Sequence, residues 1–183
     1  EAMEGFLAAN KDYVQVEGAS AIRVRNLKDK PAMIVGGGSG HEPMFGYFVG
    51  ENLADASVAG SVFTSPDPGS ILQAAQAVDR GKGILFVYGN YSGDNMNFDI
   101  AGEMLGDMDI PVKTVRVGDD VASASKENYL DRRGIAGNVL VIKIAGAATA
   151  VHAQQPAADT YPDKPVVLVV PTAPAGGPDT IAR

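Results

Sequence analysis

The segment 35–43 combines residue types that could hold a small ligand and act on it chemically. It reads Val-Gly-Gly-Gly-Ser-Gly-His-Glu-Pro and contains His41, one of only two histidines in the chain. Glycines let the backbone turn tightly and let a ligand approach the amides without a Cβ in the way. An imidazole on an open loop can act as an acid or a base near neutral pH. The glycines alone also fit a plain tight turn, and His41 is the residue that favours a ligand site.

Two well-known nucleotide-binding patterns do not fit this segment. A Walker loop is excluded because no Gly-Lys-Ser or Gly-Lys-Thr follows the glycines. The dinucleotide fingerprint fails because Gly36 and Gly38 are not followed by a third glycine at the required step. The glycines therefore do not predict a nucleotide site.

Acidic residues offer a second candidate group. Asp94 lies in Asn-Tyr-Ser-Gly-Asp-Asn at 90–95, where it could cap a helix, hydrogen-bond a substrate hydroxyl or orient a histidine. Asp119 and Asp120 could bind a metal together with Asp94, because hard cations prefer carboxylates. Adjacent aspartates after a strand more often cap the next helix, so we predict no metal site.

Secondary structure must bring these residues together. Apolar runs predict strands at 13–16, 21–24, 32–35, 61–63, 83–88, 112–117 and 139–142. Helical spacing predicts helices at 2–9, 68–80 and 98–105, with Thr64 or Ser65 capping the second. We expect a further helix with Pro43 in its first turns, and Met96, Met104 and Met108 in the core. Strands that alternate with helices predict an α/β domain with a largely parallel sheet flanked by helices.

Polar segments follow successive predicted strands. They lie at 36–41, 64–65, 90–94 and 119–120. In parallel α/β sheets, ligands bind at the carboxyl ends of the strands, where backbone amides and helix N-termini converge. We therefore expect one shared site at that edge of the sheet.

Composition limits the function classes. The chain has 183 residues, 45% of them hydrophobic, a formal net charge of −7 and no cysteine. Disulfides, cysteine nucleophiles and thiolate metal sites are therefore excluded, and no nucleic-acid partner is expected. No apolar run reaches membrane-spanning length, so we expect no membrane partner. The absence of cysteine is compatible with the cytoplasmic location that we expect. The chain starts without a methionine, and we expect it to begin inside a longer natural sequence.

Five motifs in order resemble the dihydroxyacetone kinase family, in its substrate-binding K subunit or K domain. The resemblance covers roughly residues 1–148. Its motifs are Gly-Gly-Gly-Ser-Gly-His-Glu-Pro at 36–43, Phe-Thr-Ser-Pro at 63–66, Asn-Tyr-Ser-Gly-Asp at 90–94, Asp-Asp-Val-Ala at 119–122 and Arg-Arg-Gly at 132–134.

This resemblance implies a function and a site. The family phosphorylates dihydroxyacetone and related short ketoses, and its K subunit, here expected as a homodimer, binds the ketose. A separate helical subunit or domain carries ATP or ADP with magnesium, so no cofactor is expected in this domain. The resemblance assigns substrate binding to Gly38, Ser39, Gly40, His41 and Asp94. His41 would be the general base or hydrogen-bond partner, and Asp94 would hold the substrate hydroxyls.

The chain departs from the family pattern in three ways. The family commonly has a lysine where this chain has Gly89, which favours a larger ketose such as a tetrulose. No residue matches the second histidine, which anchors the substrate covalently in the family, and His152 stands in the wrong context. The family's complete K chain is also far longer. We therefore predict the ketose-binding part of a kinase, incomplete as it stands. The alternative is a non-enzymatic binding module for a ketose or a carboxylate.

The end of the chain resembles a different class of protein. Residues 159–183 are similar to the start of mature periplasmic binding proteins of the tripartite tricarboxylate transporter type. We therefore expect 149–183 to be a tail of different origin from the domain at 1–148. Val166–Val170 would add one more strand.

Overall fold

The computed structural model describes residues 2–152. The predicted strand at 166–170 and the transporter-like segment 159–183 lie outside the described residues.

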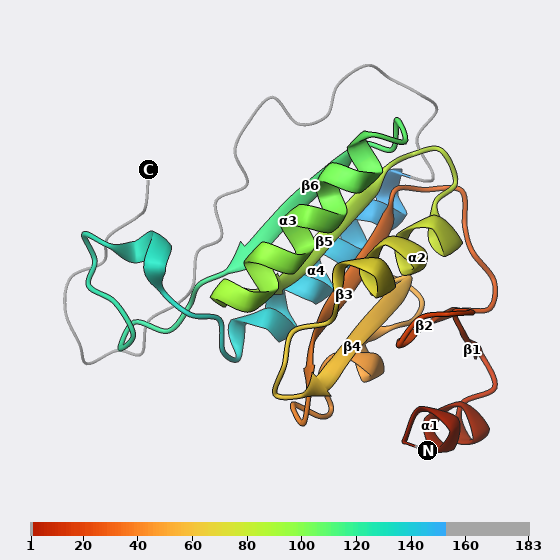
Figure 1. The fold of residues 1–183 in the computed structure, drawn as a ribbon, viewed down its shortest axis with the longest axis horizontal. Helices are drawn as coiled ribbons and strands as arrows, with labels where there is room; N and C mark the ends of the chain where they lie inside the picture. The colour runs from red at the N-terminus through yellow and green to blue at the C-terminus, as the bar shows by residue number, and fades with distance from the viewer. Residues whose placement is uncertain (1, 153–183) are drawn as a thin grey trace.

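A six-stranded sheet forms the centre of the described chain (Figure 1). Its strands are β1 (Tyr13–Gln15), β2 (Ala21–Val24), β3 (Ala32–Ser39), β4 (Ala56–Val62), β5 (Ile84–Gly89) and β6 (Val112–Val117). The spatial order is β1-β2-β4-β3-β5-β6. Strands β4, β3, β5 and β6 run parallel to one another. At the β4 edge, β2 pairs antiparallel with β4, and β1 pairs antiparallel with β2. The predicted α/β fold with a largely parallel sheet is confirmed.

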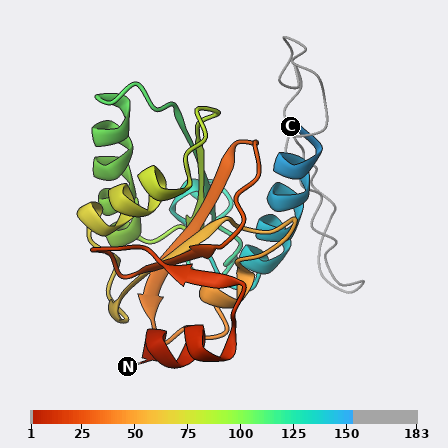
Figure 2. The same cartoon turned by 90° about the vertical axis from the view of Figure 1, so that its right-hand side faces the viewer.

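Helices cover both faces of this sheet. They are α1 (Ala2–Ala9), α2 (Pro68–Val78), α3 (Ser92–Gly106) and α4 (Gly137–His152), with short 3₁₀ helices η1 (Gly46–Phe48) and η2 (Tyr129–Asp131). Figure 2 shows α2 and α3 on one side of the sheet and α4 on the other. No helix within the described residues is long and apolar enough to cross a membrane.

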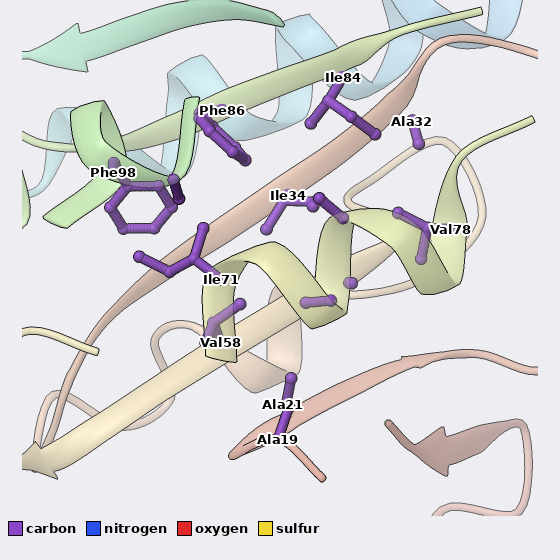
Figure 3. Packing of buried hydrophobic residues seen from close by; sticks show 14 of the residues in the cluster. Ala19, Ala21, Ala32, Ile34, Val58, Ile71, Val78, Ile84, Phe86 and Phe98 are labelled. Carbon is purple, nitrogen blue, oxygen red and sulfur yellow. The ribbon is translucent and has the colours of Figure 1, made fainter. Parts of the chain in front are cut away.

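Successive side chains of β3 pack into two separate hydrophobic cores, because the side chains of a strand alternate between the two faces of the sheet. Ile34 packs with Phe86, Phe98 and the α2 side chains (Figure 3). On the other face, Met33 and Val35 pack with Ile142 of α4. A strand buried on both faces needs a continuous apolar run, which explains why the sequence of β3 lacks polar alternation.

The glycines after this run belong to the strand and not to a loop. The prediction of a strand ending at residue 35 and a loop at 36–41 was wrong in this respect, since β3 continues through Ser39. The reason is close packing. A Cβ on Gly36 would lie 2.7 Å from the Val58 backbone oxygen, and one on Gly38 would lie 2.7 Å from the Thr64 backbone nitrogen. Only glycine lets these backbones approach so closely.

Gly36→Ala is therefore expected to lower the free energy of unfolding by about 1–3 kcal/mol, because the added methyl overpacks the sheet. Urea unfolding monitored by circular dichroism measures the change. Gly106→Ala is the matched control, because a Cβ there meets no atom within 4 Å. Equal unfolding midpoints for the two variants would contradict the packing argument.

Two predicted strands need correction. The strand predicted at 61–63 overlaps only the end of β4, which runs from Ala56 to Val62. The small alanines, serines and glycine of β4 give no continuous apolar run, so the sequence pattern does not indicate its start. The strand at 139–142 is wrong, since these residues form the first turns of α4. A short apolar run fits a buried strand or a buried helix equally well. Val141, Ile142 and Ala145 face the core with helical spacing.

Helix boundaries and the methionines also differ from prediction. The helix expected at Pro43 is absent, and the short 3₁₀ helix η1 lies just after this proline instead. The N-cap of α2 is Asp67 and not Thr64 or Ser65. Helix α3 starts at Ser92 and not at 98. The Asp67 side chain accepts a hydrogen bond from the Ser70 backbone nitrogen at 2.9 Å. The three methionines predicted in the core are 61%, 37% and 47% exposed, in the order Met96, Met104 and Met108.

Candidate functional site

Three of the four predicted polar segments meet at the carboxyl edge of the sheet. His41 follows β3, Ser65 follows β4 and Asp94 lies in the first turn of α3, directly after β5. Strand β3 is paired in parallel with both β4 and β5, so the three strand ends lie side by side. Burial raises the pKa of the Asp94 carboxyl, and both Ser65 and His41 act against this larger effect to lower it.

The glycine segment packs against the chain that leaves β4. The Ser39 hydroxyl donates a hydrogen bond of 2.6 Å to the Gly60 carbonyl, and its own carbonyl accepts one of 2.8 Å from the Phe63 backbone nitrogen. Gly40 has a φ of +102°, a conformation that favours glycine. Gly38 is buried, Ser39 is half-buried, and Gly40 and His41 are exposed. The Ser39 hydroxyl thus already has a partner within the fold.

Asp94 is a half-buried carboxyl group with an unused acceptor. Its Oδ1 atom is buried and has no hydrogen-bond partner among the described residues. Burial raises the pKa of Asp94, and the interactions with Ser65 and His41 oppose this rise. Asp94 is not the helix cap, because Tyr91 occupies the N-cap position of α3. A desolvated carboxylate with a free oxygen is suited to accept a hydrogen bond from a ligand hydroxyl.

Asp94→Asn is expected to raise the melting temperature of the free protein at pH 7. The raised pKa means that the folded state disfavours the charged carboxylate, and asparagine carries no charge to desolvate. The gain should vanish below the ordinary aspartate pKa of about 3.9, where the carboxyl is protonated in both states. Thermal melts of both proteins between pH 3 and pH 7 test this sign. A variant that is less stable at pH 7 would contradict it.

The fourth polar segment, at 119–120, does not join the other three but forms hydrogen bonds to the backbone at the start of α4. Asp119 accepts hydrogen bonds of 2.7 Å from the backbone nitrogens of Ile135 and Gly137, and so holds the start of α4. The helix-capping interpretation is confirmed for Asp119.

The Asn90 side chain donates hydrogen bonds to the carbonyls of Leu130 and Arg132 at 2.8 and 2.7 Å, which links the loop after β6 to the end of β5. No group of three or more His, Asp or Glu side chains within residues 2–152 could hold a metal ion.

A cavity of about 660 Å³ lies beside the glycines, between α1 and the sheet. Gly37, Gly38 and Ser39 line it, together with Glu42 and Phe45, whereas His41 and Asp94 do not. Its size lies within the range of small-molecule sites. The glycine segment thus borders this cavity, although His41 and Asp94 are not part of its lining.

Sequence reasoning expected the segment 64–65 at the shared site but gave Ser65 no role toward Asp94. It missed Phe63, which was expected only as the end of a strand. The signal that could have found Phe63 is its place at the start of the Phe-Thr-Ser-Pro motif, next to the polar segment of the site.

A glycine-rich strand end, an imidazole and a desolvated carboxyl at the carboxyl edge of a parallel sheet are typical of α/β domains that bind small molecules. The family model of the Dak1 domain matches residues 4–158. The chain therefore belongs to the Dak1 domain family, as the five motifs predict.

Relatives of known name agree with this membership. The chain is 48% identical over 154 residues to the dihydroxyacetone-binding subunit DhaK of PTS-dependent dihydroxyacetone kinase 2 from Listeria innocua, covering 82% of this chain and 46% of that protein. It is 41% identical over 149 residues to L-erythrulose 1-kinase from Mycolicibacterium smegmatis, covering 81% of this chain and 26% of that protein. The chain thus spans less than half the length of either relative.

A solved structure shows the same fold. The native dihydroxyacetone kinase of C. freundii matches with a TM-score of 0.76 and 36% sequence identity. The match covers 82% of this chain and 28% of that chain.

Proposed function

We propose that this chain is the ketose-binding part of a kinase that phosphorylates dihydroxyacetone or a related short ketose such as a tetrulose. The observation that carries this proposal is the position of His41 and Asp94 at the carboxyl ends of the adjacent parallel strands β3 and β5, in a chain of the Dak1 family. Gly38, Ser39 and Gly40 form the cradle, and Asp94 holds the ketose hydroxyls through its free Oδ1 atom.

His41 is the proton acceptor in this proposal. The hydroxyl of the ketose loses its proton to the imidazole while its oxygen forms a bond to phosphorus. At the same time the bond from phosphorus to the donor's leaving group breaks. In phosphoryl transfer most of the transition-state charge is handled by groups that hold the phosphoryl donor. We propose that those groups come from a partner that carries the phosphoryl donor.

We propose a helical donor subunit or domain, carrying ATP or ADP with magnesium, as that partner; a phosphotransferase-system protein would supply the phosphoryl group in the PTS-dependent variant. The Listeria relative is a subunit of a PTS-dependent kinase, which supports the second route. The Mycolicibacterium relative is an L-erythrulose 1-kinase, which supports the choice of a tetrulose. A homodimer and a cytoplasmic location complete the proposal.

Gly89 bears on the size of the ketose. It is buried at the end of β5, and a Cβ there would lie 3.2 Å from the Asn138 Nδ2 atom and 3.4 Å from the Tyr91 ring. Packing against Asn138 and Tyr91 therefore accounts for glycine at this position. The choice of a ketose larger than dihydroxyacetone rests on the absence of the lysine that the family commonly has here, and not on open space beside the strand.

For the organisation of the chain, we propose that residues 1–148 form the ketose-binding domain, incomplete relative to whole kinases, and that 149–183 have a different origin. The family match extends past this proposed boundary and ends at residue 158, so residues 149–158 fall within the matched segment.

The experiment is a calorimetric titration of the protein with dihydroxyacetone, L-erythrulose and, as a carboxylate, citrate. The proposal predicts ketose binding, with phosphorylated ketose formed only when a donor subunit and ATP are added. Ketose binding without turnover in the presence of a competent donor would favour the non-enzymatic module. Binding of citrate in place of either ketose would contradict the kinase proposal.

A further inference from the structure

Phe63 occupies an unusual position next to the candidate site. It directly follows β4, has a φ of +50° and is 70% exposed. Bulky residues rarely adopt this backbone conformation, and an exposed phenylalanine gains little from burial. Neither feature contributes to the stability of the fold. Strained residues of this kind concentrate at functional sites.

The glycine segment is shaped around this residue. The Phe63 backbone nitrogen donates a hydrogen bond of 2.8 Å to the Ser39 carbonyl. A Cβ on Gly38 would lie 3.0 Å from the Phe63 Cα atom, and a Cβ on Gly40 would lie 2.9 Å from the Phe63 ring. Gly38 and Gly40 therefore leave room for Phe63. The Phe63 ring lies against Gly40, directly before His41.

The Phe63 ring contacts the His41 imidazole edge to face. The two ring centroids are 5.3 Å apart and the ring planes make an angle of 70°. This geometry is the favoured one for aromatic pairs. Within residues 2–152 the imidazole makes no side-chain hydrogen bond, and its aromatic contact is with the Phe63 ring.

We propose that Phe63 is a positioning residue, which holds the His41 imidazole in the orientation that faces Asp94 and the ketose. The role assigned to the imidazole rests on the proposed function, but the contact between the rings does not. The strained backbone places the ring beside His41, at a position where a relaxed loop would leave the imidazole free to rotate. Stability is thereby sacrificed for orientation, as is common at active sites.

The test is nuclear magnetic resonance of the imidazole in a His152→Gln background, which leaves His41 as the sole histidine. The ring of Phe63 displaces the His41 carbon-bound proton signals by its ring current. In Phe63→Leu these signals should move to the positions of a free histidine, and in Phe63→Tyr they should stay displaced. L-erythrulose affinity should fall about 2- to 10-fold in Phe63→Leu and recover in Phe63→Tyr.

Phe63→Gly separates positioning from stability. Glycine adopts a positive φ without strain, so this variant should melt at or above the wild-type temperature while the His41 signals still lose their displacement. A residue with a merely structural role would give the opposite pattern, with a lower melting temperature and unchanged His41 signals.

Two results would overturn the inference. The first is unchanged His41 signals in Phe63→Leu, and the second is displaced signals that are lost without any change in ketose affinity. A wild-type protein that binds no ketose would contradict the proposed function instead, and the ring-current comparison would still decide whether Phe63 orients His41.

Discussion

Asp94→Ala is expected to weaken the binding of dihydroxyacetone and L-erythrulose about 10- to 100-fold. The physical reason is the loss of a hydrogen bond to a charged acceptor, which contributes about 1.5–3 kcal/mol. Asp94 is suited to this role because its Oδ1 atom is buried and has no partner among the described residues. Isothermal titration calorimetry of both proteins with each ketose measures the change.

Asp99→Ala is the matched control for this experiment. Asp99 lies on the same helix, is exposed and pairs with Arg116 at 2.6 Å. Its removal should leave ketose affinity unchanged, although both variants delete one carboxylate from α3. If Asp94→Ala and Asp99→Ala bind ketoses equally well, Asp94 does not hold the ligand. His41→Ala provides a companion measurement, since removing a general base should slow phosphoryl transfer about 10²- to 10⁴-fold once a donor subunit is present.

Asp55→Ala is expected to lower the free energy of unfolding by about 3–5 kcal/mol, because it leaves a buried ammonium group without its counter-charge. Lys30 and Asp55 form an ion pair whose side chains are only 4% and 7% exposed. The same carboxylate accepts a hydrogen bond of 2.8 Å from the Met33 backbone nitrogen. Lys30 Nζ also lies 3.4 Å from the Thr149 hydroxyl of α4. The pair thus links β3, β4 and α4.

Glu51→Ala is the matched control, because it breaks an ion pair of 2.7 Å with Lys28 whose side chains are 73% and 58% exposed. An exposed pair contributes at most about 1 kcal/mol. Urea unfolding at pH 7 compares the two, and the milder Asp55→Asn extends the comparison if Asp55→Ala does not fold. The double variant Lys30→Met, Asp55→Leu should recover much of the loss, since it removes both charges. Equal losses for Asp55→Ala and Glu51→Ala would show that burial does not strengthen this pair.

Much of the fold could be predicted because burial leaves a direct mark on composition. The strand at 83–88 is β5 within one residue, and the strand at 112–117 is β6 at both ends. Such segments stand out because a central parallel strand needs apolar residues on both faces. The association of His41 and Asp94 with strand ends follows from the same segments.

Other elements could not be predicted, since local pattern does not report packing. The apolar run at 139–142 is helical because α4 packs one side of it, Val141 and Ile142, against the sheet. Met96 and Met104 have apolar side chains of the kind that fill protein cores, yet both are exposed on α3. Side-chain type alone cannot distinguish the inner from the outer side of a helix whose apolar residues are spread around its axis.

The sequence by itself determined the family, the α/β fold with a largely parallel sheet and the residue types at the strand ends, because these depend on local composition and on motifs. Only the tertiary structure decided which ends meet. Strand β3 lies between β4 and β5, so the segments after these three strands converge and Asp94 comes within the influence of His41. Asp119, at the end of the edge strand β6, turns to the backbone of α4 instead. Strand order is set by packing over the whole domain, and no local stretch of sequence encodes it.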